Sequence, residues 1–79
     1  ILSTEQQYNE YVLTSLRTIW GVDSAIIQNK FGAEIHGHFL KEIEKWISKE
    51  YILSEENIII LTQEGKAFAD AIASDLFIV

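Results

Sequence analysis

The chain has 79 residues, of which 48% are hydrophobic and 23% are charged, and it contains no cysteine. This length holds one small core and excludes a second one, so we expect residues 1–79 to form a single domain. Six basic against twelve acidic residues give a net charge of −6, which disfavours nonspecific binding to nucleic acid. The lack of cysteine excludes a disulfide framework, a thiol nucleophile and a thiolate-held zinc or iron–sulfur site within these residues.

The two ends and the hydropathy of the chain suggest a piece of a longer protein. The sequence begins with Ile1 instead of Met and shows no basic segment followed by an apolar stretch. Its longest aliphatic run, residues 58–61, is far too short to span a bilayer. We therefore expect a cytoplasmic fragment from the C-terminal end of a longer protein, without a membrane span.

The first predicted element is a helix over residues 4–19. Ser3 or Thr4 is suited to cap it, with a glutamine three positions later as the capping-box partner. Apolar side chains then recur at the spacing of a helix as far as Ile19. This pattern places Ile19 in the buried stripe of the helix.

Two further helices are expected in the next thirty or so residues. Gly21 supplies a left-handed stop, and Asp23 then caps a short helix that ends at Phe31 and Gly32. A third helix is predicted from residue 33 to about residue 50, and it is the most strongly amphipathic element.

The only β signal lies after this third helix. Residues 51–53 and 57–61 are β-branched and aromatic runs separated by a short polar segment, which predicts a hairpin. Thr62 then caps a last helix to about residue 77, whose predicted buried stripe comprises Gly65, Phe68, Ala69, Ile72 and Leu76. The order is H-H-H-β-β-H, which predicts a mainly α fold with a small β-hairpin and a winged-helix-like three-helix core.

Few side chains suggest a catalytic or metal site. His36 and His38 lie two residues apart and point about 200° from each other on a helix, so they cannot share a metal ion. A surface or half-buried position is expected for both, and direct haem ligation by one of them stays an alternative. Neighbouring glutamates such as Glu42 and Glu44 diverge and indicate a solvated face. We expect no catalytic, cofactor-binding or metal-binding residue in this chain.

A stripe of three lysines is the best sequence argument for nucleic-acid binding. Lys41, Lys45 and Lys49 follow one face of the third helix, where a DNA-binding winged helix has its recognition helix. Acidic residues flank them, the helix has no arginine for bidentate guanine readout, and Glu55 and Glu56 in the hairpin loop would repel phosphate. We therefore do not expect nucleic acid as a partner, and a DNA- or protein-binding module of a regulator is the alternative function.

Two residues near the end of the first helix are candidates for contact with a partner. Arg17 is the one arginine of the chain, and either a local ion pair with Asp23 or a docking contact would explain it. Trp20 follows the helix and is expected to be partly exposed. The apolar residues 77–79 extend beyond the last helical stripe and are expected to pack on a surface outside the chain.

Two stretches, residues 11–23 (YVLTSLRTIWGVD) and 61–77 (LTQEGKAFADAIASDLF), carry motifs that are specific in combination. With the segment between them, they resemble the C-terminal domain of the oxygen-independent coproporphyrinogen III oxidase family, and the likeness is closer to its haem-chaperone branch. The sequence departs from that family at Ser15, where glycine is frequent, and at Ser24, where a large aliphatic residue is frequent.

The resemblance implies a radical S-adenosylmethionine protein whose catalytic barrel lies upstream and holds an iron–sulfur cluster on three cysteines. Members of the family decarboxylate coproporphyrinogen III or, in the closer branch, bind haem and pass it to acceptor proteins. The resemblance assigns S-adenosylmethionine, the cluster and haem or porphyrinogen to the longer protein, and no ligand to this chain. It implies that this chain covers or docks on the barrel, and for Arg17, Trp20, Asp70 and Asp75 we infer a structural or docking role.

Overall fold

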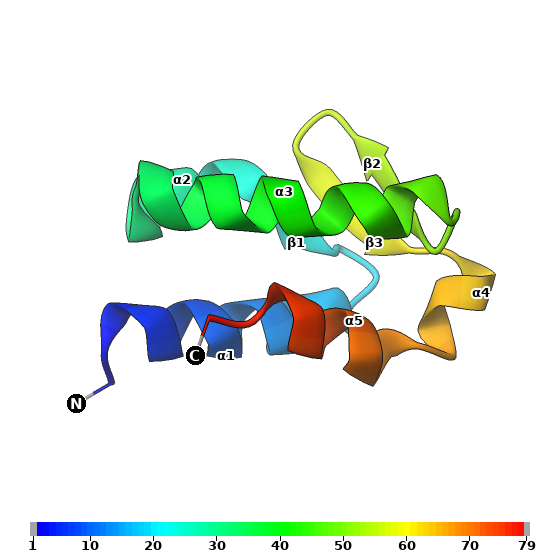
Figure 1. Ribbon diagram of the computed structural model, residues 1–79, viewed down its shortest axis with the longest axis horizontal. Helices are drawn as coiled ribbons and strands as arrows, with labels where there is room; N and C mark the ends of the chain where they lie inside the picture. Colours follow the sequence, from blue (N-terminus) through cyan, green and yellow to red (C-terminus); the bar gives the residue numbers. More distant parts are fainter. Residues whose placement is uncertain (1, 79) are drawn as a thin grey trace.

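The structure is a computed structural model, and it describes residues 2–78. This part of the chain forms five helices and three short strands. The elements are α1 (Thr4–Leu16), β1 (Val22–Asp23), α2 (Ser24–Phe31), α3 (Ala33–Ser48), β2 (Ile52–Glu55), β3 (Ile58–Leu61), α4 (Gln63–Lys66) and α5 (Ala69–Leu76). The predicted mainly α class with a small β-hairpin is confirmed. Figure 1 shows two layers, with α1 and α5 in one and α2, α3 and the sheet in the other.

The starts of the first two helices follow the predicted caps. Ser3 caps α1 and forms a capping box with Gln6. The carboxylate of Asp23 accepts a hydrogen bond from the backbone N–H of Ala25 at 2.9 Å and so caps α2. None of the helices within residues 2–78 has the length and apolar character needed to cross a lipid bilayer.

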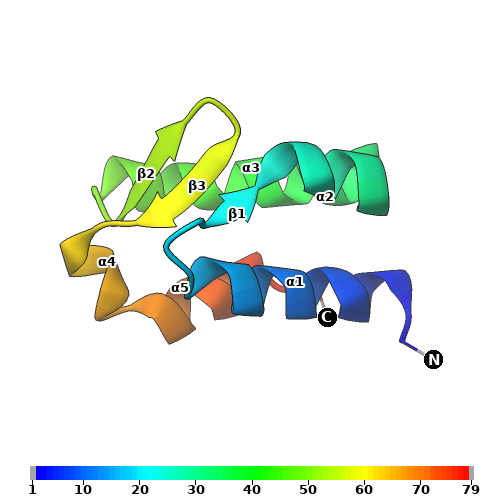
Figure 2. The ribbon, with the colours of Figure 1, turned by 180° about the vertical axis from the view of Figure 1, so that it is seen from behind.

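The sheet contains one strand more than the sequence pattern predicts. β1 pairs with β3 in antiparallel register, with Val22 opposite Ile59 and Asp23 opposite Ile58. The predicted hairpin of β2 and β3 is confirmed, so β3 is the central strand, as Figure 2 shows. β1 is too short to show the alternation that reveals a strand in a sequence.

The two layers enclose one hydrophobic core. Its buried side chains come from α1, α2, α3, α5 and all three strands, and they include Tyr8, Ile27, Phe39, Ile52, Ile59 and Ile72. The Tyr8 ring is fully buried, and its hydroxyl donates a 2.8 Å hydrogen bond to the carbonyl of Leu76. This bond ties α1 to the end of α5 across 68 residues of sequence.

The first helix ends three residues earlier than predicted. The backbone N–H and the hydroxyl of Thr18 both donate to the carbonyl of Ser15, at 3.0 and 2.8 Å. In a continuing helix, this carbonyl would accept from the N–H of Ile19. Ile19 therefore leaves the helix and is 85% exposed, so the prediction that it is buried is wrong.

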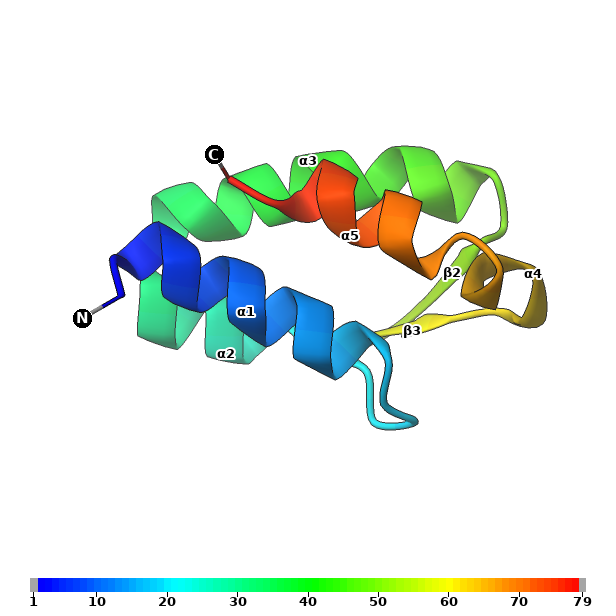
Figure 3. The ribbon, with the colours of Figure 1, turned by 90° about the horizontal axis from the view of Figure 1, so that it is seen from below.

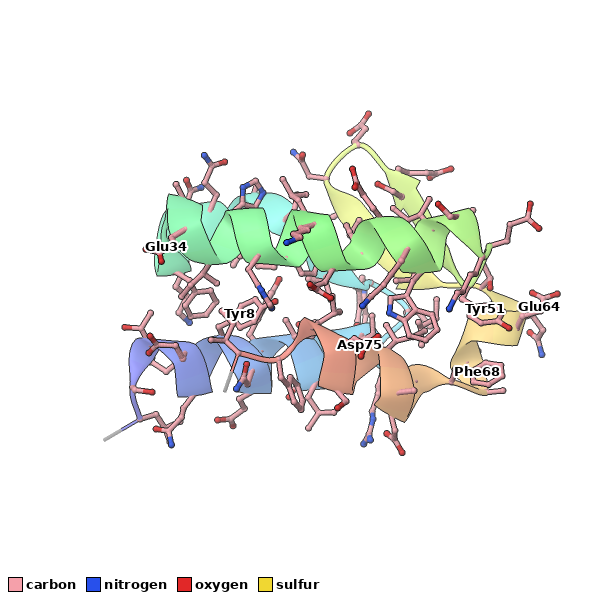
Figure 4. The ribbon with its side chains drawn as sticks, in the orientation of Figure 1. Tyr8, Glu34, Tyr51, Glu64, Phe68 and Asp75 are labelled. Carbon is pink, nitrogen blue, oxygen red and sulfur yellow. The ribbon has the colours of Figure 1, made fainter. Side chains whose placement is uncertain are left out.

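The predicted last helix is two helices, α4 and α5. The N–H of Phe68 donates to the carbonyl of Gly65 at 2.9 Å, and Phe68 has φ −114° and ψ 19°, outside the helical region. The Phe68 ring is 45% exposed instead of buried, and it stacks on Tyr51 with ring centroids 4.9 Å apart. Both residues lie at the end of the molecule where α4 turns the chain (Figure 4).

The residues after α5 fold back onto the domain itself. Phe77 and Ile78 pack against the core, and the side-chain amide of Asn9 exchanges two 2.8 Å hydrogen bonds with the backbone of Ile78. The expectation that this segment packs on a surface outside the chain is therefore wrong for residues 77 and 78. Val79 lies outside the described residues.

Candidate docking surface

The loop between α1 and β1, residues 17–21, exposes two large apolar side chains next to each other. Ile19 is 85% exposed and Trp20 is 75% exposed. The exposure predicted for Trp20 is confirmed. We call residues 17–21 the apolar loop. Adjacent exposed apolar side chains mark an interaction site more often than isolated ones, and tryptophan is enriched among the residues that dominate binding energy.

A groove lies beside the apolar loop. Its volume is about 450 Å³, and its lining residues come from α1, the apolar loop, β3, α4 and α5: Leu16, Arg17, Thr18, Ile19, Ile60, Leu61, Lys66 and Ala69. We call it the α1–β3 groove. Figure 3 shows the end of α1, β3 and the α4–α5 connection that carry these residues. The walls are mainly aliphatic, and Arg17 and Lys66 supply two positive charges.

Arg17 pairs with Asp70, across 53 residues of sequence. The guanidinium Nη2 lies 2.8 Å from the carboxylate Oδ1, and the side chains are 59% and 87% exposed. The local ion pair with Asp23, one of the two explanations for Arg17, does not form, since Arg17 pairs with Asp70 and the Asp23 carboxylate caps α2. An exposed ion pair contributes about 0–1 kcal/mol to stability, so Arg17 is able to exchange this partner at little cost.

Asp75 lies away from the groove, between α5 and α3 (Figure 4). It accepts a 3.1 Å hydrogen bond from the indole N–H of Trp46, and it also forms an ion pair with the Lys45 ammonium at 3.5 Å. Lys45 also pairs with Glu42 at 2.9 Å, and this hydrogen bond lowers the pKa of the Glu42 carboxyl and raises the pKa of Lys45. The structure thus brings Arg17 of the apolar loop together with Asp70 of α5, and it gives Asp75 intramolecular contacts.

Two residues of α3, Lys45 and His38, and the residue that follows its C-terminal end, Lys49, also have intramolecular contacts. Lys45 forms the pairs described above, and the ammonium of Lys49 lies 4.8 Å from the centroid of the Trp46 ring. The Nε2 atom of His38 lies 3.2 Å from the Leu76 carbonyl oxygen that also accepts from Tyr8. Lys45, Lys49 and His38 therefore each contribute to the packing of α3.

Ile19 and Lys66 belong to the candidate docking surface, and the sequence pattern does not indicate either of them. The helical spacing places Ile19 in the buried stripe of the first helix, and Lys66 occurs only within the second motif. Thr18 is the local signal for Ile19, because a threonine hydroxyl competes for the carbonyl three or four residues earlier. No local signal marks Lys66, since the fold alone brings it into the same groove as the apolar loop and β3.

A small helical domain with exposed apolar side chains beside a groove is typical of modules that bind other protein surfaces. Residues 2–68 match the family model described as the HemN C-terminal domain. The match spans most of the chain, so this protein belongs to the HemN C-terminal domain family. Arg17, Trp20 and Lys66 lie within the matched residues, and Asp70 and Asp75 lie beyond them. No curated protein and no solved structure matches the chain significantly.

Proposed function

We propose that this chain is the accessory C-terminal domain of a HemN-like radical S-adenosylmethionine protein, and that it docks on the catalytic barrel of that protein. The observation that carries this proposal is the apolar loop, where Ile19 and Trp20 present their side chains to solvent inside the segment that matches the family. Burial of both side chains against a partner surface would remove a large apolar area from water.

The chemistry of such a protein belongs to its barrel. The iron–sulfur cluster that the family uses needs thiolate ligands, and this chain has no cysteine to supply them. We assign no catalytic residue to residues 1–79. The domain instead helps to enclose or present a tetrapyrrole, which is either coproporphyrinogen III for decarboxylation or, in a haem chaperone, haem for transfer. A cytoplasmic location belongs to the same proposal.

The first test concerns the gene. The coding sequence upstream of Ile1 should contain a C-x3-C-x2-C motif, the spacing of the cluster ligands in the family that the chain resembles. Finding the motif supports the radical protein. An upstream sequence without it overturns that part of the proposal.

The second test concerns docking. The upstream part, expressed separately, should bind residues 1–79 in sedimentation-velocity experiments. The double variant Ile19→Ser with Trp20→Ala should lose binding by at least about tenfold, because both side chains lie on the proposed contact surface. Leu53→Ser is the matched control, since Leu53 is another exposed apolar residue but lies on β2. Equal binding by all three proteins would contradict docking through the apolar loop.

A further inference from the structure

We infer that the segment which occupies the α1–β3 groove is an acidic amphipathic stretch of protein, with carboxylates on both sides of its apolar residues. This inference rests on the proposed docking function and specifies the chemistry of the docked surface. It follows from three observations: the positive charge of the groove, the availability of Arg17 and Lys66 to a partner, and the exposed apolar residues of the adjoining loop.

The charge of the groove is opposite to that of the chain. Residues 1–79 carry a net charge of −6, whereas the lining of the groove contains Arg17 and Lys66 and, within residues 2–78, no carboxylate. Four other surface cavities each have at least one glutamate in their lining, from the set Glu5, Glu10, Glu34, Glu55 and Glu56. The groove is therefore the cavity among these five that complements a negatively charged partner.

Both cations of the groove are available to a partner. Lys66 takes part in none of the ion pairs that the described residues form. Arg17 is held by Asp70 alone, in a pair so exposed that water already competes for it. The aliphatic walls exclude water, so a partner carboxylate beside them is attracted to Arg17 with less screening by solvent. The attraction between Arg17 and the solvated Asp70 carboxylate is screened more strongly. Arg17 then exchanges Asp70 for the partner.

The occupant is a protein segment, because the apolar surface continues beyond the groove. Ile19 lines the groove and is also one of the two exposed side chains of the apolar loop. A small molecule seated in the groove would contact Ile19 but not Trp20, which is exposed and lies outside the groove lining. A helix or strand is longer than the groove and so is able to contact the rest of the apolar loop as well. Its apolar residues would contact Ile19 and Trp20, and its flanking carboxylates would meet Arg17 and Lys66.

Designed peptides test this inference. Three fluorescein-labelled helical peptides of about 18 residues would share one row of leucines and carry glutamate, glutamine or lysine at the flanking positions. Binding to residues 1–79 would be measured by fluorescence anisotropy at about 50 mM and about 500 mM salt. The glutamate peptide should bind best and the lysine peptide worst, which is the reverse of the order that the net charge of the chain would produce.

Variants then locate the effect. Arg17→Ala and Lys66→Ala should each weaken binding of the glutamate peptide about two- to fivefold and leave the glutamine peptide unaffected, since each removes one ion pair. Lys41→Ala is the matched control, because Lys41 is an exposed lysine on α3, outside the groove lining. The inference is overturned if the lysine peptide binds best, if the glutamate peptide does not bind, or if Lys41→Ala has the same effect as the groove variants.

The outcomes separate this inference from the proposed function. If the upstream part docks and Arg17→Ala and Lys66→Ala leave its binding unchanged, the acidic partner is excluded and docking stands. If the upstream part does not dock, the proposed function fails, and the peptide series decides on the chemistry of the groove by itself.

Discussion

At the scale of single residues, backbone contacts decide where a side chain is tolerated. Gly65 is buried and lies against the backbone of Tyr51, so an added Cβ would collide with the Tyr51 carbonyl oxygen. Gly37 lies in α3, and an added Cβ there would meet open space. The same substitution should therefore have opposite effects at the two positions.

Gly65→Ala should lower the free energy of unfolding by about 1–3 kcal/mol, because the methyl group forces the α4 backbone away from Tyr51. Gly37→Ala should raise it by about 0.5–1 kcal/mol, because alanine is the better helix former. Urea denaturation of both variants beside the wild-type protein measures the two changes. Changes of the same sign would contradict the contact between Gly65 and Tyr51.

The Tyr8 phenol makes the free energy of unfolding depend on pH in the alkaline range. Burial, and secondarily the Glu42 carboxylate, raises the pKa of the Tyr8 phenol above its ordinary value of 10.0. The unfolded chain thus releases this proton at lower pH than the folded domain. The stabilisation is complete below about pH 10 and is lost as the pH rises through the range above it.

The variant Tyr8→Phe should be about 1 kcal/mol less stable at neutral pH, because it lacks the hydrogen bond to the Leu76 carbonyl. Its free energy of unfolding should also fall less than that of the wild-type protein between about pH 9 and about pH 11. Urea denaturation at several pH values compares the two slopes. If the free energy of unfolding falls equally with pH in the two proteins, Tyr8 is not the source of the loss of stability at alkaline pH.

At the scale of elements, the Thr62 side chain connects two segments, the start of α4 and the residues after α3. Its hydroxyl accepts from the N–H of Gly65 at 3.1 Å, as the cap of α4, and donates to the carbonyl of Glu50 at 2.8 Å. Glu50 follows α3 and has a φ of +64°, so its carbonyl is positioned by an uncommon backbone conformation. The single hydroxyl thus holds the start of α4 against the end of α3.

Thr62→Ala should lower the free energy of unfolding by about 1–2 kcal/mol, the usual cost of a lost helix cap. Thr62→Ser keeps the hydroxyl and should retain most of the stability. Thermal and urea denaturation distinguish the two variants. If serine is as destabilising as alanine, the loss arises from the threonine methyl group and not from the cap.

The predicted helix starts are correct because local chemistry determines them, whereas β1 and the break between α4 and α5 accompany distant contacts and are not predicted. The starts of α1 and α2 depend on side chains within three residues, Ser3 with Gln6 and Asp23, and the sequence predicts both. β1 exists because Val22 pairs with Ile59. The break between α4 and α5 accompanies the stacking of Phe68 on Tyr51, which a sequence pattern does not reveal.

At the scale of the whole molecule, the candidate docking surface is only partly predictable from the sequence. Arg17 is conspicuous as the one arginine, and Trp20 follows a predicted helix, so the sequence marks both. The Arg17–Asp70 pair joins positions 53 residues apart, and Lys66 reaches the groove only after α4 has turned the chain. The family match covers residues 2–68 and does not point to any particular surface of the domain.

Substitution of Trp20 in the apolar loop should leave the stability of the domain nearly unchanged, so that its effect on docking is measured separately. In residues 1–79 alone, Trp20→Ala should change the free energy of unfolding by less than about 0.5 kcal/mol, because Trp20 is largely exposed. Trp46→Ala should cost about 3–5 kcal/mol, because Trp46 is buried in the core. Similar losses in the two variants, measured by urea denaturation, would show that Trp20 is a structural residue.

Hydrogen exchange tests the central claim, that the apolar loop and the adjoining groove dock on the barrel, most directly. Exchange would be followed by mass spectrometry in residues 1–79 alone and in the longer HemN-like protein. We expect slower exchange in the longer protein across residues 17–21 and 60–66, with the exchange of residues 28–36, at the opposite end of the domain, unchanged. Equal exchange of the loop and groove segments in the two proteins would contradict docking through this surface.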